Sequence, residues 1–212
     1  MRNRQVFACV VVIEAMWLFG LTGCVGIGGE QIKIAHGSLD VPTQQFSEQL
    51  HVLSPAVDLR EEKGKVGRAT ITVFAITGGG VTTQSPLEEE VAREVKEAFE
   101  ASGYRVELLR QGTAKAEVDT LVKVSIKEFW FKNYNWTWPV VRTWGDVEIG
   151  VTVENAAGQS VFERSFKASG SSGCLSGQCA FEAAVSEAMS EVVKQIREMA
   201  VSEEFRRAIR KI

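Results

Sequence analysis

The sequence has few of the side chains that most enzymes use for catalysis. Only two of its 212 residues are histidine, His36 and His51. It contains no Gly-x-Ser-x-Gly nucleophile elbow, no His-Glu-x-x-His zinc motif and no phosphate-binding loop ending in Gly-Lys-Ser/Thr. We therefore predict that the protein is not an enzyme and that it binds no metal and no cofactor.

Strong charge of either sign is also missing. The formal net charge is −3, and no basic patch of the kind that binds nucleic acid stands out. The composition therefore predicts no nucleic-acid partner, and the length suits a single folded domain.

A short apolar run near the N-terminus indicates a leader. Arg2 and Arg4 precede a mostly apolar stretch from Val6 to Leu21, which is too short for a membrane span and is typical of a signal peptide. The run closes with Leu21-Thr22-Gly23-Cys24, which resembles the lipobox of bacterial lipoproteins. The resemblance implies that residues 1–23 are removed and that Cys24 carries lipid, which anchors the protein to a membrane. Val25, which is not Asp, implies the periplasmic face of the outer membrane.

Cysteine is scarce, with four residues in all. Cys9 lies in the leader and Cys24 is the lipid site, so Cys174 and Cys179 remain. An oxidising compartment and an even number favour a Cys174–Cys179 disulfide. The alternative is a metal or redox pair, although two thiols without neighbouring ligands make a poor metal site.

The chain after Cys24 divides into a tether and one domain. We expect residues 24–48 to be a lipidated N-terminus and tether, in which 31–35 and 38–41 are either extended chain or short strands. Residues 49–212 form the domain. Its first two strands are expected at 50–53 and 68–76, and the three glycines Gly78, Gly79 and Gly80 are expected to form the turn that ends the second.

Helix signals follow at two places. Ser85, Pro86 and Glu88 have the spacing of a capping box at the start of a helix, and Gly103 is placed to end it. Near the C-terminus, apolar residues from Phe181 to Met199 recur at helical spacing. Ser202 is placed to cap a short last helix with Phe205 and Ile209 inward.

Alternating residues between the helices predict the remaining strands. A short strand is expected at 104–109, and longer strands at 116–131, 146–154 and 159–168 form an antiparallel meander of three. In the strand at 146–154 the residues expected to face inward are Val147, Ile149, Val151 and Val153. We expect residues 133–139 to be a turn region and 169–173 a flexible loop. The predicted class is α+β, with the helices packed on one face of the sheet.

Aromatic residues concentrate at the first turn of this meander, where the candidate partner-binding residues are Trp130, Tyr134, Trp136 and Trp138. Strand alternation predicts that Phe129 and Phe131 share one face and Trp130 the other. Two outcomes remain open. The rings either cover the helix-free face of the sheet as cross-strand pairs, or Trp136 and Trp138 are exposed and dock on a protein, an envelope glycan or a membrane.

Four features together resemble the YajG-like family of bacterial lipoproteins. They are the lipobox, the helix end Ala98-Phe99-Glu100-Ala101-Ser102-Gly103-Tyr104, the long strands around 122–131 and 147–153, and the closing helix. The resemblance implies an envelope location without an agreed activity. We therefore expect a non-catalytic binding or scaffolding module of the cell envelope. The alternative is an auxiliary lipoprotein of a transport or secretion system that carries a lipid or a small apolar ligand.

Overall fold

The computed structural model describes residues 31–34, 45–71, 76–112, 118–137 and 140–210. The leader and Cys24 lie outside these ranges. The elements are β1 (Gln31–Ile32), β2 (Gln49–Ser54), β3 (Val57–Asp58), β4 (Gly67–Ile71), β5 (Ile76–Thr83), α2 (Leu87–Ala101), β6 (Arg105–Arg110), β7 (Thr120–Thr137), β8 (Val140–Asn155), β9 (Ser160–Cys174), α3 (Gly177–Val201) and α4 (Glu203–Arg210).

The predicted meander is confirmed and forms the long part of the sheet. β7 pairs antiparallel with β8 from Thr120↔Asn155 to Thr137↔Val140, and β8 pairs antiparallel with β9. The inward residues of β8 are those that the alternation predicted, and all are fully buried: Val147, Ile149, Val151 and Val153. One face of this meander therefore supplies most of the apolar surface on which the core is built.

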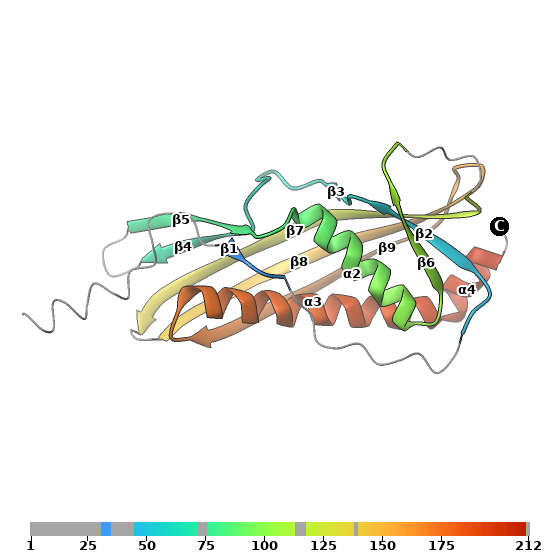
Figure 1. Ribbon diagram of the computed structural model, residues 1–212. Helices are drawn as coiled ribbons and strands as arrows, with labels where there is room; N and C mark the ends of the chain where they lie inside the picture. The colour runs from blue at the N-terminus through green and yellow to red at the C-terminus, as the bar shows by residue number, and fades with distance from the viewer. Residues whose placement is uncertain (1–30, 35–44, 72–75, 113–117, 138–139, 211–212) are drawn as a thin grey trace, which may run out of the picture.

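The other edge of β7 pairs with three short strands in succession. β2, β3 and β4 lie parallel to β7, at residues 121–122, 125–126 and 131–134 of β7 respectively. β6 adds to β2, while β5 and then β1 add to β4 (Figure 1). β7 is therefore the shared strand of a mixed sheet, and the meander is only half of that sheet.

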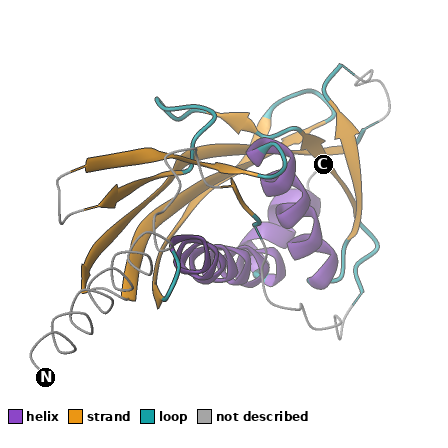
Figure 2. Ribbon diagram, turned by 60° about the vertical axis from the view of Figure 1, so that its left-hand side comes forward, coloured by secondary structure: helices purple, strands orange, loops and turns teal. Residues whose placement is uncertain are grey.

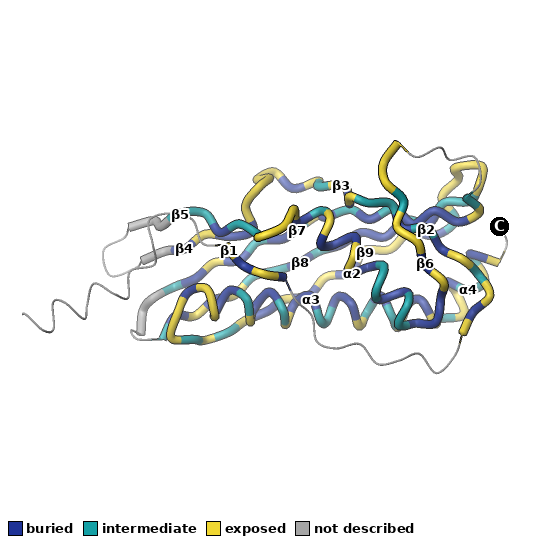
Figure 3. Tube along the Cα trace, viewed as in Figure 1, coloured by how far each residue is buried: buried dark blue, intermediate teal, exposed yellow. Residues whose placement is uncertain are grey.

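The helices cover one face of the sheet, as predicted (Figures 1 and 2). α3 runs along β8 and β9, and α2 packs against α3, β2 and β6. In Figure 3 buried positions recur along β7, β8 and α3. At one end of the core, Phe205 of α4 stacks on Phe99 of α2, with ring centroids 5.6 Å apart, and meets Tyr104 edge-on.

Three turn or loop predictions were wrong. β7 continues to Thr137, so residues 133–137 of the expected turn region at 133–139 are strand. The three glycines lie inside β5, and β4 already ends at Ile71. Residues 169–173 belong to β9, where small side chains let α3 come close: a Cβ on Gly170 would lie 1.9 Å from the carbonyl oxygen of Ala184. At Gly170 the missing side chain is therefore needed for the close approach of α3, and a loop prediction takes no account of this.

The predicted capping box is also absent. α2 begins at Leu87 with Pro86 in the N-cap position, and no side chain caps it. The Thr83 hydroxyl instead donates to the carbonyl oxygen of Ser85, at 2.5 Å. The other end agrees with the prediction, because Gly103 has a φ of 101° directly after Ser102.

Part of the segment that we expected to be tether is folded. β1 pairs with β5, and both Ile32 and Ile34 are buried. Phe46 is buried as well and stacks on Tyr104, with ring centroids 4.6 Å apart. These apolar side chains join the core, so the folded domain includes residues before 49.

Candidate functional site

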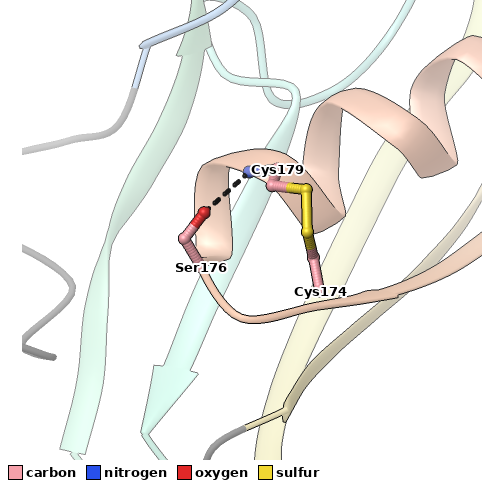
Figure 4. Close-up of a disulfide and its surroundings, with 3 residues drawn as sticks. All are labelled: Cys174, Ser176 and Cys179. Atoms are coloured by element: carbon pink, nitrogen blue, oxygen red, sulfur yellow. Dashed lines mark hydrogen bonds between the residues drawn. A yellow bond between two sulfur atoms is a disulfide. The ribbon is translucent and has the colours of Figure 1, made fainter.

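The cysteines that we expected to pair are joined. Cys174 is the last residue of β9 and Cys179 lies in the first turn of α3, and the structure contains the disulfide between them with a Cα–Cα distance of 5.9 Å (Figure 4). The Ser176 hydroxyl accepts a hydrogen bond from the backbone N–H of Cys179 and caps the helix. The disulfide therefore fixes the corner at which the meander turns into α3.

The aromatic stretch is divided between the two faces of β7. Phe129 and Phe131 are fully buried on the face that the helices cover, as predicted. Trp130 and Tyr134 are half-buried on the opposite face. The backbone of Trp136 belongs to β7, and Trp138 lies outside the described residues, so their role as docking residues stays a prediction.

A bulge in β7 explains this division. Ile126 pairs with Ile149 but Glu128 pairs with Glu148, so the register shifts by one residue between them. The inward side chains are even-numbered before the shift, ending at Ile126, and odd-numbered after it, beginning at Phe129. The bulge thus turns Trp130 and Tyr134 to the helix-free face.

Trp144 of β8 completes an aromatic pair on that face. Its ring stacks on Tyr134 with a centroid distance of 4.5 Å and an interplanar angle of 6°. The register pairs Tyr134 with Arg142, so the two rings are diagonal neighbours across the hairpin. Trp144 keeps 46% of its surface exposed, although it is a large aromatic side chain. A stacked ring pair therefore lies on the helix-free face, and it is both a cross-strand contact and partly exposed.

Three cations flank the stacked rings. Lys132 pairs with Trp144 across β7 and β8, Arg68 of β4 pairs with Lys132, and Arg142 pairs with Tyr134. All three are exposed, and among the described residues none of them forms an ion pair. We call Trp130, Tyr134, Trp144, Arg68, Lys132 and Arg142 the aromatic patch.

Three lysines on the rest of the helix-free face have polar partners. Lys123 contacts Glu154 at 2.5 Å, Lys127 donates to the Ser165 hydroxyl at 2.6 Å, and Lys167 contacts Glu128 at 2.7 Å. The hydrogen bond to Glu128 and the charge of that residue raise the pKa of Lys167. The lysines on this part of the face are therefore bound to neighbouring side chains, unlike the three cations of the aromatic patch.

The sequence analysis nominated Trp130 and Tyr134 but missed Trp144 and the cations. Trp144 lies eight residues after Trp136 in the sequence, and only the hairpin register places it beside Tyr134. The expected turn between the two strands was the available signal, because it brings Trp144 close to Tyr134. Counting back from Thr137↔Val140 would nevertheless pair Tyr134 with Thr143, and a register shift between Tyr134 and Thr137 makes the partner Arg142. Arg68 had no such signal, because it reaches the patch through the parallel pairing of β4.

A buried ion pair supports the middle of β7. The Arg60 guanidinium donates to both carboxylate oxygens of Asp58, at 2.9 and 2.8 Å, and to the carbonyl oxygens of Lys65 and Phe129, at 2.7 and 3.1 Å. Phe129 lies between the stretches of β7 that pair with β3 and with β4. Burial alone would raise the pKa of Asp58, but the hydrogen bonds and charge of Arg60 lower it below its usual value. Arg60 thus donates a hydrogen bond to a carbonyl oxygen of β7 that lies between the stretches paired with β3 and with β4.

The described residues offer little material for catalysis. Across these ranges no group of three or more His, Cys, Asp or Glu residues is placed to hold a metal ion. His36 lies outside them, and His51 Nε2 is 3.8 Å from a carboxylate oxygen of Glu107. The prediction that the protein is not an enzyme stays a prediction.

An apolar hollow lies at the opposite end of β7 from the aromatic patch. Its volume is about 270 Å³, and its lining includes Leu53, Leu109, Val118 and Leu121. Ligand pockets for small molecules usually measure ~300–1,000 Å³. The hollow is therefore at the lower limit for a small apolar ligand.

No family model matches the chain, and no curated protein matches it. Among solved structures it is similar to protein XCC0632 from Xanthomonas campestris, of the family model DUF330, with a TM-score of 0.50 and 15% identity over 82% of this chain and 94% of that one. A minor lipoprotein from Acinetobacter baumannii gives a TM-score of 0.38 and 8% identity, covering 74% of this chain and 95% of that one. Lipoprotein GNA1162 from Neisseria meningitidis gives 0.32 and 12%, covering 71% and 99%.

At 15% identity the likeness to XCC0632 shows a shared α+β fold and nothing finer. The resemblance to the YajG-like family stays a prediction. Within the part of the chain that the structure describes, no helix is both long enough and apolar enough to cross a membrane.

Proposed function

We propose that the protein is a lipid-anchored, non-catalytic binding or scaffolding module of the bacterial cell envelope. Its anchor is the lipid on Cys24, and its location is the periplasmic face of the outer membrane. The lipobox at residues 21–24 supports the anchor, and the absence of Asp after Cys24 supports the choice of membrane.

The aromatic patch is the observation that carries the binding role. A stacked Tyr134–Trp144 pair with half of the Trp144 surface exposed, bordered by three cations, lies on a face that no described helix covers. Exposed aromatic and arginine side chains are the residues that dominate binding surfaces. On the rest of the same face, Lys123, Lys127 and Lys167 are bound to neighbouring side chains.

Replacing Cys24 with Ser tests the anchor. Wild-type protein from cells fed labelled palmitate should carry the label and sediment with membranes, whereas Cys24→Ser protein should lose the label and either leave the membrane fraction or accumulate uncut. Cys9→Ser is the matched control, because Cys9 lies within the leader that processing removes. An unlabelled wild-type protein would refute the anchor.

Carriage of a small apolar ligand is the second candidate function, and it rests on the hollow lined by Leu53, Leu109, Val118 and Leu121. Mass spectrometry of solvent extracts from the purified protein should then detect a bound molecule. Leu109→Trp, which fills the hollow, should remove that molecule. If the extracts of both proteins are equally empty, the hollow is not a ligand site.

A further inference from the structure

We infer that the aromatic patch rests on an anionic phospholipid surface, namely the membrane in which the lipid on Cys24 is anchored. The inference depends on the proposed lipid anchor and names the partner of the patch. It follows from the chemistry of the patch and from the place at which the chain enters the fold.

The residue types of the patch match those of a membrane interface. Trp and Tyr are favoured there because their rings are apolar and carry one polar atom. Lys and Arg beside them extend their charged ends to the headgroups, which are negative in anionic bilayers. Of the acids near the patch, Asp146 pairs with Trp130 in register, and its carboxylate accepts a hydrogen bond from the Ser169 hydroxyl at 2.6 Å. The patch is therefore both aromatic and positively charged.

The register places the start of β1 level with the patch. Gln31 pairs with Thr82 of β5, the adjacent Val81 pairs with Gly67 of β4, and Gly67 pairs with Phe131 of β7. Strand neighbours lie about 4.8 Å apart, so three steps separate Gln31 from β7 by about 14 Å along the sheet. Phe131 lies between Trp130 and Lys132, which belong to the patch.

The direction of β1 brings the anchor to the same end. β1 runs parallel to β5, so the chain enters β1 from the side on which Ile76 begins β5. Ile76 pairs with Ile71, which is the end of β4 next to the Thr70↔Tyr134 pair. Seven Cα–Cα steps lead from Cys24 to Gln31 and span at most about 25 Å even when fully extended. A lipid on Cys24 therefore holds the bilayer within reach of the patch, and the opposite end of β7 lies farther away.

The tryptophans allow a direct test. Of the five tryptophans, Trp17 is in the leader and the other four lie between residues 130 and 144. The processed, lipidated protein is reconstituted into vesicles of phosphatidylglycerol and brominated phosphatidylcholine, since bromine quenches tryptophan only at close range. We expect a blue shift and quenching of tryptophan emission, with less quenching when phosphatidylglycerol is omitted or when salt is raised.

A matched pair of variants isolates the patch. The variant Arg68→Gln/Lys132→Gln/Arg142→Gln should lose most of the quenching. The control Arg105→Gln/Lys194→Gln/Arg207→Gln removes as many exposed cations from β6, α3 and α4 and should keep it. Equal quenching in the two variants, or none in the wild-type protein, would overturn the inference. Crosslinks from the patch to an envelope protein without quenching would overturn it in favour of a protein partner.

Failure of the anchor gives a different result. Cys24→Ser protein without its leader should still show quenching, but only at higher vesicle concentration, because the patch then binds unaided. Each cation contributes roughly a five-fold change in affinity for an anionic surface, so the patch variant of this protein should bind about 100-fold more weakly. If no vesicle concentration produces quenching, the patch does not bind the bilayer, whatever the state of Cys24.

Discussion

The carboxyl group of Glu94 should make the stability of the protein depend on pH near neutrality. Glu94 lies on α2 and is only 2% exposed. Burial is the main cause that raises its pKa from 4.5 to about 7. The negative charges of Glu97 and Glu90 also raise this pKa, while the positive charge of Arg93 lowers it. One pKa unit corresponds to about 1.4 kcal/mol, so this rise amounts to about 3 kcal/mol of difference between the two protonation states in the fold.

The sign follows from linkage. A pKa that is higher in the folded state favours the protonated fold, so its contribution to stability is complete below pH 4.5 and is lost as the pH rises through about 7. Glu94→Gln resembles the protonated acid and cannot ionise. At pH 8 the variant should therefore be more stable than the wild-type protein by about 3 kcal/mol, while at pH 4 the two should be nearly equal.

Urea unfolding followed by circular dichroism measures this difference at each pH. Glu89→Gln is the matched control, because Glu89 is an exposed glutamate of the same helix, and it should leave the pH profile unchanged. The reasoning would be refuted if the difference between Glu94→Gln and wild type were the same at pH 4 and pH 8.

Three further changes test the fold. Arg60→Met should cost about 3–5 kcal/mol, because it leaves the Asp58 carboxylate buried without its partner, and the double variant with Asp58→Leu should recover most of that loss; a single-variant loss below 1 kcal/mol would contradict this role. Replacing Cys174 and Cys179 with Ser should lower the free energy of unfolding by only about 2 kcal/mol, because the closed loop is short, which comparison with reduced wild-type protein checks. Gly170→Ala should cost roughly 1–3 kcal/mol by pushing α3 off β9, whereas Gly173→Ala, whose Cβ meets its nearest neighbour at 3.5 Å, should be tolerated; equal melting temperatures for the two would contradict the close contact with Ala184.

The local pattern of the sequence predicted the strands and helices that are amphipathic. The alternation of Val147, Ile149, Val151 and Val153 identified β8 and its inward face, and Phe205 and Ile209 were placed correctly on the buried side of α4. Both predictions succeed because a local signal, the spacing of apolar residues within the element, identifies the face that is buried. The same holds for the Cys174–Cys179 disulfide, whose partners are separated by five positions.

The remaining features depend on partners that the sequence does not announce. Nothing in the residues of β2, β3 or β4 indicates that each pairs with β7, since periodicity identifies a strand and not its neighbour. Arginine side chains are mostly exposed in proteins. Arg60 is nevertheless buried, and it donates a hydrogen bond to the carbonyl oxygen of Phe129. The aromatic patch was missed for the same reason. Arg68 and Trp144 join it only because β4 and β8 pair with opposite edges of β7.

The two edges of β7 differ in how far away in the sequence their partners lie. On one edge β8 follows directly, and β9 and α3 continue the same local run. On the other edge residue 51 pairs with 121 and residue 67 with 131, so about 70 residues must be closed into a loop before these pairs form. Contacts between residues distant in sequence form slowly, because the entropy of loop closure opposes them. The C-terminal meander with α3 should therefore assemble first and serve as the template on which the N-terminal strands align. The part of the chain that is synthesised first is then the part that becomes ordered last.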